Sequence, residues 1–121
     1  MPTVEVKTNV KIDDVPAYIL KLSKFSVETL SKPESYMNVI VSQNVPMSFN
    51  GTLDPAFQCT ITSLGNINPD ANVKYSAAFS KFFEETLKVP NDRGYITFID
   101  PGRSHLGYQG TTFAELFGGK K

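Results

Sequence analysis

Two stretches of the chain alternate apolar and polar residues, which is the pattern of a β-strand with one buried face. Residues 3–7 place valines between threonine, glutamate and lysine, and residues 57–62 place phenylalanine, cysteine and isoleucine between glutamine and threonines. Two other runs, residues 37–41 and 95–99, are rich in the β-branched and aromatic side chains that favour strands. The pattern therefore predicts four strands.

Apolar residues recur three or four positions apart in residues 15–30 and 71–87, and this period is that of an amphipathic helix. Each stretch is preceded by residues whose side chains can accept hydrogen bonds from the first backbone N–H groups, and a proline suits the first turn. Each predicted helix lies between two of the predicted strands. The candidate caps are Asp13 or Asp14 ahead of Pro16, and Asn68 or Asp70 beside Pro69.

The two halves of the chain repeat each other at a constant offset, which takes residue 23 to residue 80. Residues 23–30 read SKFSVETL and residues 80–87 read SKFFEETL. Similar helix composition could explain that match, but it does not explain identities elsewhere at the same offset. We therefore infer an internal duplication. The further matching pairs are Asn9 with Asn66, Asp13 with Asp70, Tyr18 with Tyr75, and Pro33 with Pro90.

A duplicated β-α-β unit predicts how these elements are arranged. Crossover connections between parallel strands are right-handed, which places both helices on one face of the sheet. We expect an α/β (α+β) fold with a four-stranded mixed sheet, in one domain over residues 1–117 with pseudo-repeats at about 2–50 and 57–113. Residues 118–121 read GGKK and are predicted to be a disordered tail.

The face of the sheet away from the helices would carry polar side chains such as Glu5, Lys7 and Thr60. This face therefore either meets water or lines a wet interface between subunits. Residues 46–49 and 106–108 resemble short additional strands, and residues 113–117 resemble a closing turn.

Composition narrows the class of protein. The chain has 121 residues, 40% of them hydrophobic, and a formal net charge of +0, so it lacks the basic excess of a nucleic-acid-binding protein. Its apolar runs are too short to span a bilayer, and its first residues do not form a secretory leader, so we expect a cytoplasmic protein. A single cysteine, Cys59, and a single histidine, His105, allow no intrachain disulfide and offer too few ligands for a Cys- or His-based metal site.

Pro2 is the first candidate for chemistry. Removal of the initiator Met1 would expose a secondary amine at the start of the first strand. An α-amino group has a pKa of about 8, and burial in an apolar pocket or a neighbouring cation lowers that pKa toward the range in which general bases work. Position alone is weak evidence, because most prolines that follow an initiator methionine have no such role.

Lys32 and Tyr95 are two further candidates. Lys32 lies between the first helix and the next strand, where it is either a solvated turn lysine or a cation that stabilises a carboxylate or a developing enolate. Tyr95 opens the last strand and is either a packing aromatic or a site residue. Cys59 lies on the predicted buried face and is expected to be an inert thiol, whereas His105 is expected in an exposed loop.

The chain resembles the macrophage migration inhibitory factor and D-dopachrome tautomerase family of the tautomerase superfamily. The resemblance covers nearly the whole chain, from MPTVEVKTNV to GYQGTTF, and rests on the joint order of short matches. These are Pro2 after Met1, Thr8-Asn9-Val10, Lys32-Pro33 before a tyrosine, Ser63-Leu64-Gly65, Asn91-Asp92-Arg93 before Tyr95-Ile96, and Gly107-Tyr108 with Thr112-Phe113.

The resemblance implies a homotrimer with active sites between subunits and no cofactor. Pro2, Lys32 and the backbone N–H of Leu64 would come from one subunit, and Tyr95 would come from its neighbour. The implied reaction is keto–enol tautomerisation of phenylpyruvate-like and dopachrome-like substrates, small aromatic 2-oxo acids among them, with Pro2 as the base. The other implied substrate-binding residues are Tyr36, Thr97, Leu106, Tyr108 and Phe113.

The alternative is a cytokine-like or host-interaction protein that is secreted by a leaderless route. Its partner would be a cell-surface receptor, and its tautomerase activity would be weak or vestigial. An enolisation assay on phenylpyruvate distinguishes the two functions.

Overall fold

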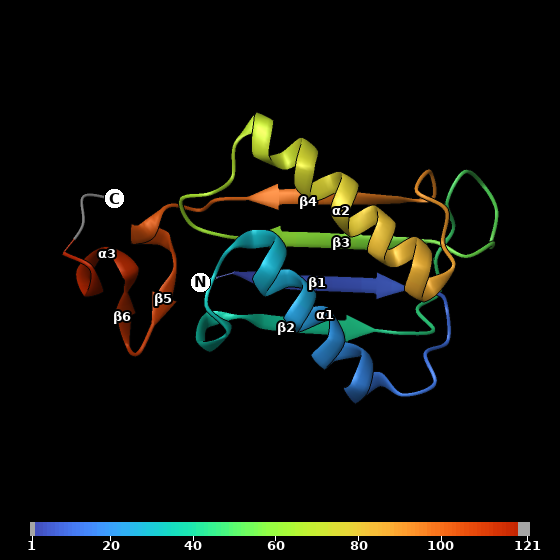
Figure 1. Cartoon of the computed structure of the whole chain (residues 1–121), viewed down its shortest axis with the longest axis horizontal. Helices are drawn as coiled ribbons and strands as arrows, with labels where there is room; N and C mark the ends of the chain where they lie inside the picture. Colours follow the sequence, from blue (N-terminus) through green and yellow to red (C-terminus); the bar gives the residue numbers. More distant parts are fainter. Residues whose placement is uncertain (1, 119–121) are drawn as a thin grey trace.

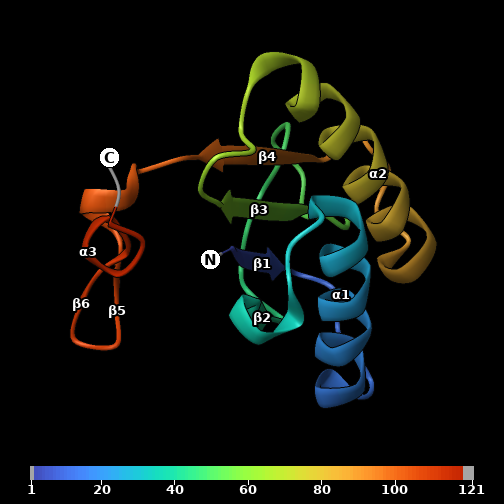
Figure 2. The same cartoon turned by 60° about the vertical axis from the view of Figure 1, so that its left-hand side comes forward.

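The computed structural model describes residues 2–118 as one mixed sheet with two long helices on the same face (Figure 1). A view turned by 60° shows both helices on one side of the sheet and leaves its other face uncovered by any helix (Figure 2). The predicted architecture is confirmed. The strands are β1 Thr3–Thr8, β2 Asn38–Ser42, β3 Phe57–Thr62 and β4 Gly94–Ile99, and the helices are α1 Val15–Leu30 and α2 Pro69–Leu87.

The strand order is β2-β1-β3-β4, with two parallel pairs joined by a central antiparallel pair. In register, Thr3 of β1 lies between Asn38 at the start of β2 and Thr62 at the end of β3. The starts of β1 and β2 and the ends of β3 and β4 therefore meet at one end of the sheet. The segments that follow β3 and β4 and precede β1 and β2 also converge there.

Both helices begin and end in the same way, as the duplication predicts. The side chains of Asp14 and Asn68 each accept a hydrogen bond from the backbone N–H three residues on, at 3.1 and 2.9 Å, which settles the choice of cap in each half. Each helix ends on a residue in the left-handed region, Ser31 with φ 55° and Lys88 with φ 61°. The chain then turns back toward the sheet.

The core lies between the sheet and the helices. Cys59 faces into it with no exposed surface, and burial raises the pKa of this thiol to about 12. The predicted inert thiol is thus deeply buried. The largest fully buried side chains of this core include Val4, Val6, Leu22, Leu30, Ile61, Phe79 and Phe83.

The C-terminal segment forms a small unit beyond the end of the sheet at which β1 begins (Figure 1). It consists of the 3-10 turn η2 Arg103–His105, a hairpin of β5 Gly107–Tyr108 and β6 Thr111–Thr112, and the short helix α3 Phe113–Leu116. The predicted strand at 106–108 and the closing turn at 113–117 are therefore present. His105 is exposed, as expected.

The predicted strand at residues 46–49 is wrong. The segment contributes only an isolated bridge, in which Phe49 and Thr52 exchange backbone hydrogen bonds of 3.1 Å around the turn at Asn50 and Gly51. Pro46 has no backbone N–H to donate, and no described strand pairs with this segment. The apolar pattern here reflects packing of side chains rather than a ladder.

At the chain end, Gly118 donates its backbone N–H to the carbonyl oxygen of Glu115 at 3.2 Å, and the rest of the predicted tail, 119–121, lies outside the described residues. Met1 also lies outside them. Within residues 2–118, no helix is both long enough and apolar enough to span a membrane.

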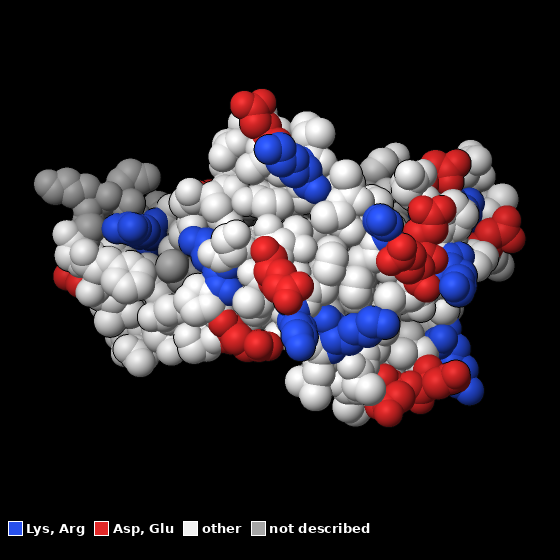
Figure 3. Space-filling model, viewed as in Figure 1, with Lys and Arg blue, Asp and Glu red and all other residues white. Residues whose placement is uncertain are grey.

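The helix-bearing face of the molecule intersperses basic and acidic side chains (Figure 3). Such mixing matches the formal net charge of +0 and leaves no extended single-sign field on this face.

Candidate active site

Pro2 is held at the end of the sheet where β1 begins. Its carbonyl oxygen accepts a hydrogen bond of 3.0 Å from the backbone N–H of Asn38, which continues the parallel pairing of β1 with β2 by one residue. The Pro2 side chain is less than 2% exposed. The backbone ladder therefore fixes this residue, and the surrounding side chains shield it from bulk water.

A cavity of about 350 Å³ opens beside Pro2. The walls come from the start of β1, the turn that leads into β2, and the C-terminal unit. The structure thus brings together Pro2 and four of the predicted substrate-binding residues from segments far apart in the sequence. The lining residues are Pro2, Thr3, Ser35, Tyr36, Met37, Asn38, Leu106, Gly107, Tyr108 and Phe113.

Three aromatic rings pack together on one side of this cavity. Tyr108 and Phe113 stack with ring centroids 5.4 Å apart and planes 4° from parallel, and Tyr36 meets both rings edge-on at 5.6 and 6.0 Å. The backbone N–H of Phe113 donates to the carbonyl oxygen of Leu106 at 3.1 Å, which ties α3 to the hairpin. Mutually packed rings form a rigid apolar wall suited to a flat aromatic ligand.

Lys32 lies between α1 and β2, and its side chain reaches the end of the sheet at which β1 begins. Its Nζ donates a hydrogen bond of 2.8 Å to the carbonyl oxygen of Leu64, which follows β3 and is 4% exposed. The turn around Leu64 is tied to β4, because Ser63 N–H donates to Ile99 O at 2.9 Å. Gly65, with φ 82°, donates its N–H to Asp100 Oδ2 at 3.0 Å. Among the described residues, no acceptor is found for the Leu64 N–H.

Tyr95 and Thr97 lie elsewhere in the subunit. Tyr95 pairs with Gln58 of β3, which pairs with Lys7 of β1, five residues from Pro2. At roughly 3.3 Å per residue, this register separates Tyr95 from Pro2 by about 17 Å along the strands alone. Tyr95 is 72% exposed and Thr97 is also exposed. Neither residue lines the Pro2 cavity of its own chain.

Five residues of the cavity were not predicted as site residues. Gly107 belongs to the Gly107-Tyr108 match, and the other four belong to no recognisable motif. One signal was available for Asn38, which stands at the offset of the internal repeat from Tyr95, so that the two are equivalent positions near the starts of β2 and β4. The five are Thr3, Ser35, Met37, Asn38 and Gly107.

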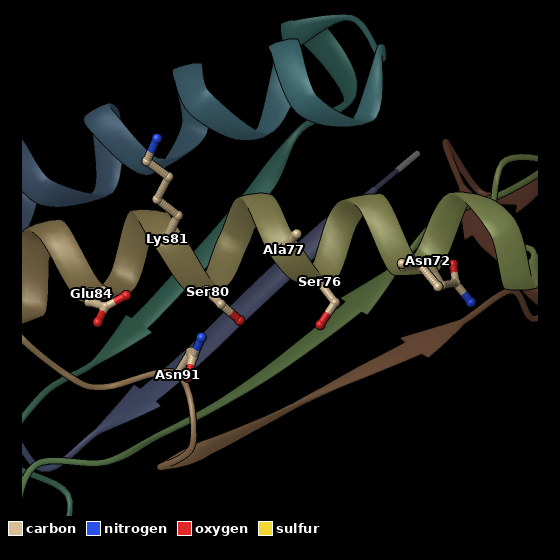
Figure 4. Close-up of a pocket in the computed structure, with 8 residues that line it drawn as sticks. Asn72, Ser76, Ala77, Ser80, Lys81, Glu84 and Asn91 are labelled. Carbon is tan, nitrogen blue, oxygen red and sulfur yellow. The ribbon is translucent and has the colours of Figure 1, made fainter.

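Two other hollows lie away from Pro2. A wider one of about 730 Å³ runs along α2, where Ser80 points toward Asn91 and Ser76 lies further along the helix (Figure 4). A smaller one of about 240 Å³ lies against Tyr95 and Phe49. Within residues 2–118, no three or more His, Cys, Asp or Glu side chains gather as metal ligands would. The Pro2 cavity is therefore the best candidate site, although it is smaller than the α2 hollow.

Comparison with known proteins identifies the family of this chain. The family model described as "Macrophage migration inhibitory factor (MIF)" matches residues 1–114. The macrophage migration inhibitory factor homolog of Trichinella spiralis is 36% identical over 114 residues, 93% of this chain and 100% of that protein. The homolog of Brugia malayi is 32% identical over 114 residues, 93% of this chain and 99% of that protein.

Solved structures indicate the same family. The macrophage migration inhibitory factor of Trichinella spiralis superposes with a TM-score of 0.86 at 34% identity, covering 92% of this chain and 99% of that one. The homologue from Prochlorococcus marinus superposes with a TM-score of 0.85 at 28% identity, covering 92% and 98%. The chain therefore belongs to the macrophage migration inhibitory factor family.

Proposed function

We propose that this chain is a keto–enol tautomerase of phenylpyruvate-like and dopachrome-like substrates, with Pro2 as general base once Met1 is removed. Family membership supports a tautomerase or cytokine function of the MIF type at the level of the family. One observation favours the enzyme: Pro2 lies buried against a cavity with an aromatic wall. A base in an apolar, water-poor site is kept in its neutral, reactive form.

The proposed reaction moves one proton within the substrate and needs no oxidant or reductant. The neutral Pro2 nitrogen takes a proton from the carbon next to the carbonyl of a 2-oxo acid. The electron pair of that C–H bond forms the new C=C bond, and the carbonyl π electrons move onto oxygen. The protonated Pro2 nitrogen then gives this proton to that oxygen, so Pro2 is neutral again when the enol leaves. A Pro2 nitrogen acylated by Met1 is an amide and has no lone pair for this step.

Lys32 and Leu64 are proposed to hold the negatively charged end of the substrate. The Lys32 ammonium and the Leu64 N–H lie at the same end of the sheet as Pro2. A cation and a fixed N–H donor both stabilise a carboxylate and the oxyanion that develops as the proton leaves carbon. The wall of Tyr36, Tyr108 and Phe113 would exclude water from these charges.

Tyr95 and Thr97 are proposed to serve the site of a neighbouring subunit in a homotrimer. The uncovered face of the sheet carries large exposed side chains, with Tyr95 at 72%, Ile99 at 42% and Ile40 at 40% exposure. Burying them against another copy of the chain would remove apolar surface from water. The same contact would bring Tyr95 to a Pro2 cavity that it does not reach within its own chain.

An enolisation assay on phenylpyruvate with wild type and Pro2→Gly tests the proposal. The intact mass of the purified protein should first show that Met1 is absent. Pro2→Gly keeps a free terminal amine but loses the rigid secondary amine, so its kcat/KM should fall by about 10²-fold or more. Equal rates would contradict the catalytic role of Pro2. They would favour the alternative, a cytokine-like protein that leaves the cytoplasm by a leaderless route and acts on a receptor.

A further inference from the structure

The Pro2 cavity contains one side-chain amide, that of Asn38. Its other described lining residues supply aromatic rings, aliphatic groups, a thioether and the hydroxyls of Thr3, Ser35, Tyr36 and Tyr108, with no charged side chain among them. A charged group is costly to transfer into such a site unless it is paired, whereas a neutral polar group needs only a hydrogen-bond partner. The lining therefore suits a neutral ligand group that can hydrogen bond to an amide.

Asn38 is fixed close to the proposed base. Its backbone N–H donates to the Pro2 carbonyl oxygen at 3.0 Å, and its Cα lies opposite Thr3 in the β1–β2 ladder. Neighbouring strands lie roughly 4.8 Å apart, so the Asn38 side chain starts about one strand spacing from β1. Main-chain bonds rather than the side chain hold this position, so the side chain can change without loss of the register.

The Asn38 amide has no structural partner among the described residues. No hydrogen bond joins its side chain to residues 2–118, and the residue is exposed. Three other asparagines show the contrast. Asn9 ties down the loop before β3, Asn66 donates to the Leu30 carbonyl oxygen at 3.0 Å, and Asn68 caps α2.

The strand order places Asn38 and Leu64 on opposite sides of Pro2. Asn38 opens β2, Leu64 follows β3, and β1 lies between these strands. A substrate whose acidic end meets Lys32 and Leu64 would therefore have its reacting carbon at Pro2 and its ring in the cavity on the Asn38 side.

We propose that Asn38 is a specificity-determining residue, whose amide hydrogen bonds a neutral polar substituent, such as a hydroxyl, on the substrate ring. This proposal rests on the proposed tautomerase function. An amide both donates and accepts hydrogen bonds, so it matches a phenolic hydroxyl in either role. A plain phenyl ring leaves the amide unpaired and forfeits that bond.

The test measures kcat/KM for 4-hydroxyphenylpyruvate and for phenylpyruvate with wild type, Asn38→Ala and Asn91→Ala. Wild type should prefer the hydroxylated substrate, and Asn38→Ala should lower that preference about tenfold, mainly through KM, since one neutral hydrogen bond contributes up to about this factor. Asn91 is exposed on the α2 side, away from Pro2, so Asn91→Ala is the matched control and should keep the wild-type preference.

The outcomes separate the two proposals. If wild type turns over both substrates but Asn38→Ala keeps the same preference, the Asn38 proposal is wrong and the tautomerase stands. Equal losses on both substrates would also contradict it, because they would show a general contribution to the site. If wild type turns over neither substrate after Met1 removal, the proposed function fails and the role of Asn38 fails with it.

Discussion

Tyr95 and Pro2 lie toward opposite ends of one sheet, because β4 runs parallel to β3 and antiparallel to β1. Tyr95 pairs with Gln58 of β3, which pairs with Lys7 near the end of β1. Pro2 precedes the first residue of β1. Strands are stiff and their register is held by backbone hydrogen bonds, so side-chain motion cannot close this separation. If both residues serve one reaction, they come from different chains.

This relationship predicts complementation between two defective variants. Tyr95→Ala should lower kcat/KM about tenfold, since loss of one hydrogen-bonding side chain costs about 1.4 kcal/mol. Pro2→Gly should be nearly inactive. When the two are unfolded together and refolded, about a quarter of the sites in a closed ring would combine an intact Pro2 with an intact Tyr95. The mixture should therefore be more active per subunit than the mean of the separate proteins. Activity equal to that mean would show that Tyr95 acts within its own chain or not at all.

Removal of the Lys32 charge should change both the rate and its pH dependence. Lys32→Ala should lower kcat/KM for phenylpyruvate about 10²-fold, as loss of an oxyanion-stabilising group does. A neighbouring cation disfavours the protonated amine, so without it Pro2 keeps its proton to higher pH. The acidic limb of the pH–rate profile should therefore move to higher pH. Lys24→Ala, an exposed lysine of α1, is the control and should leave the profile in place.

Much of the fold was predictable because each helix buries one of its faces and the sheet likewise buries only one face. The spacing of hydrophobic residues alone therefore locates these helices and strands to within a residue or two. The differences have local causes. Met37 was expected in a strand, but its N–H closes a 3-10 turn on Glu34 O at 3.0 Å, so β2 begins at Asn38. The last strand was expected from residue 95, but β4 begins at Gly94. At this position an added Cβ would lie 2.5 Å from the Phe57 ring.

The site was predictable only in part, because a cavity depends on which strand ends meet. Pro2 and Lys32 stand out locally, one at the chain start and one at a helix–strand junction. Asn38 carries no such mark, and it becomes a cavity residue only because β2 pairs in parallel with β1. The distance between Tyr95 and Pro2 is likewise a property of register, which the residue pattern does not reveal.

We expect the protein to lose stability in alkali because of two buried weak acids, Cys59 and Tyr18. Burial raises the pKa of Cys59 from 9.0 to about 12, and burial likewise raises the pKa of Tyr18 from 10.0 to about 12 despite its hydrogen bond to Thr86. Between pH 9 and 12 the unfolded chain loses these protons while the native chain keeps them, so the free energy of unfolding falls as pH rises. Each group contributes at most about 1.4 kcal/mol per pH unit within its window.

Urea unfolding at a series of pH values, at fixed protein concentration, measures this slope. Cys59→Ala should make the fall in the free energy of unfolding with pH less steep from about pH 9 upward. Below that pH the substitution should not change the slope. An unchanged slope in Cys59→Ala would show that the thiol titrates equally in both states.

Arg93 holds the loop that packs against Tyr95. Its guanidinium donates to three backbone carbonyl oxygens, those of Pro55 at 2.7 Å, Asp54 at 2.9 Å and Phe49 at 3.1 Å. The same group lies 5.6 Å from the centroid of the Phe49 ring, and that ring lies 5.2 Å from the Tyr95 ring. A single planar cation thus joins both ends of the 49–55 loop to the start of β4.

Arg93→Lys should therefore destabilise the protein although it keeps the charge. A lysine ammonium lacks the planar fork that reaches three carbonyls at once, and the carbonyls left unpaired lose hydrogen bonds to a charged donor. We expect a loss of about 2 kcal/mol in the free energy of unfolding. Urea unfolding must compare variants at equal protein concentration, because the stability of the proposed homotrimer would depend on it. Arg103→Lys is the control, since Arg103 lies over the Phe117 ring without a described hydrogen bond and should cost less than about 0.5 kcal/mol. Equal effects of the two substitutions would show that the three carbonyl contacts of Arg93 contribute nothing to stability.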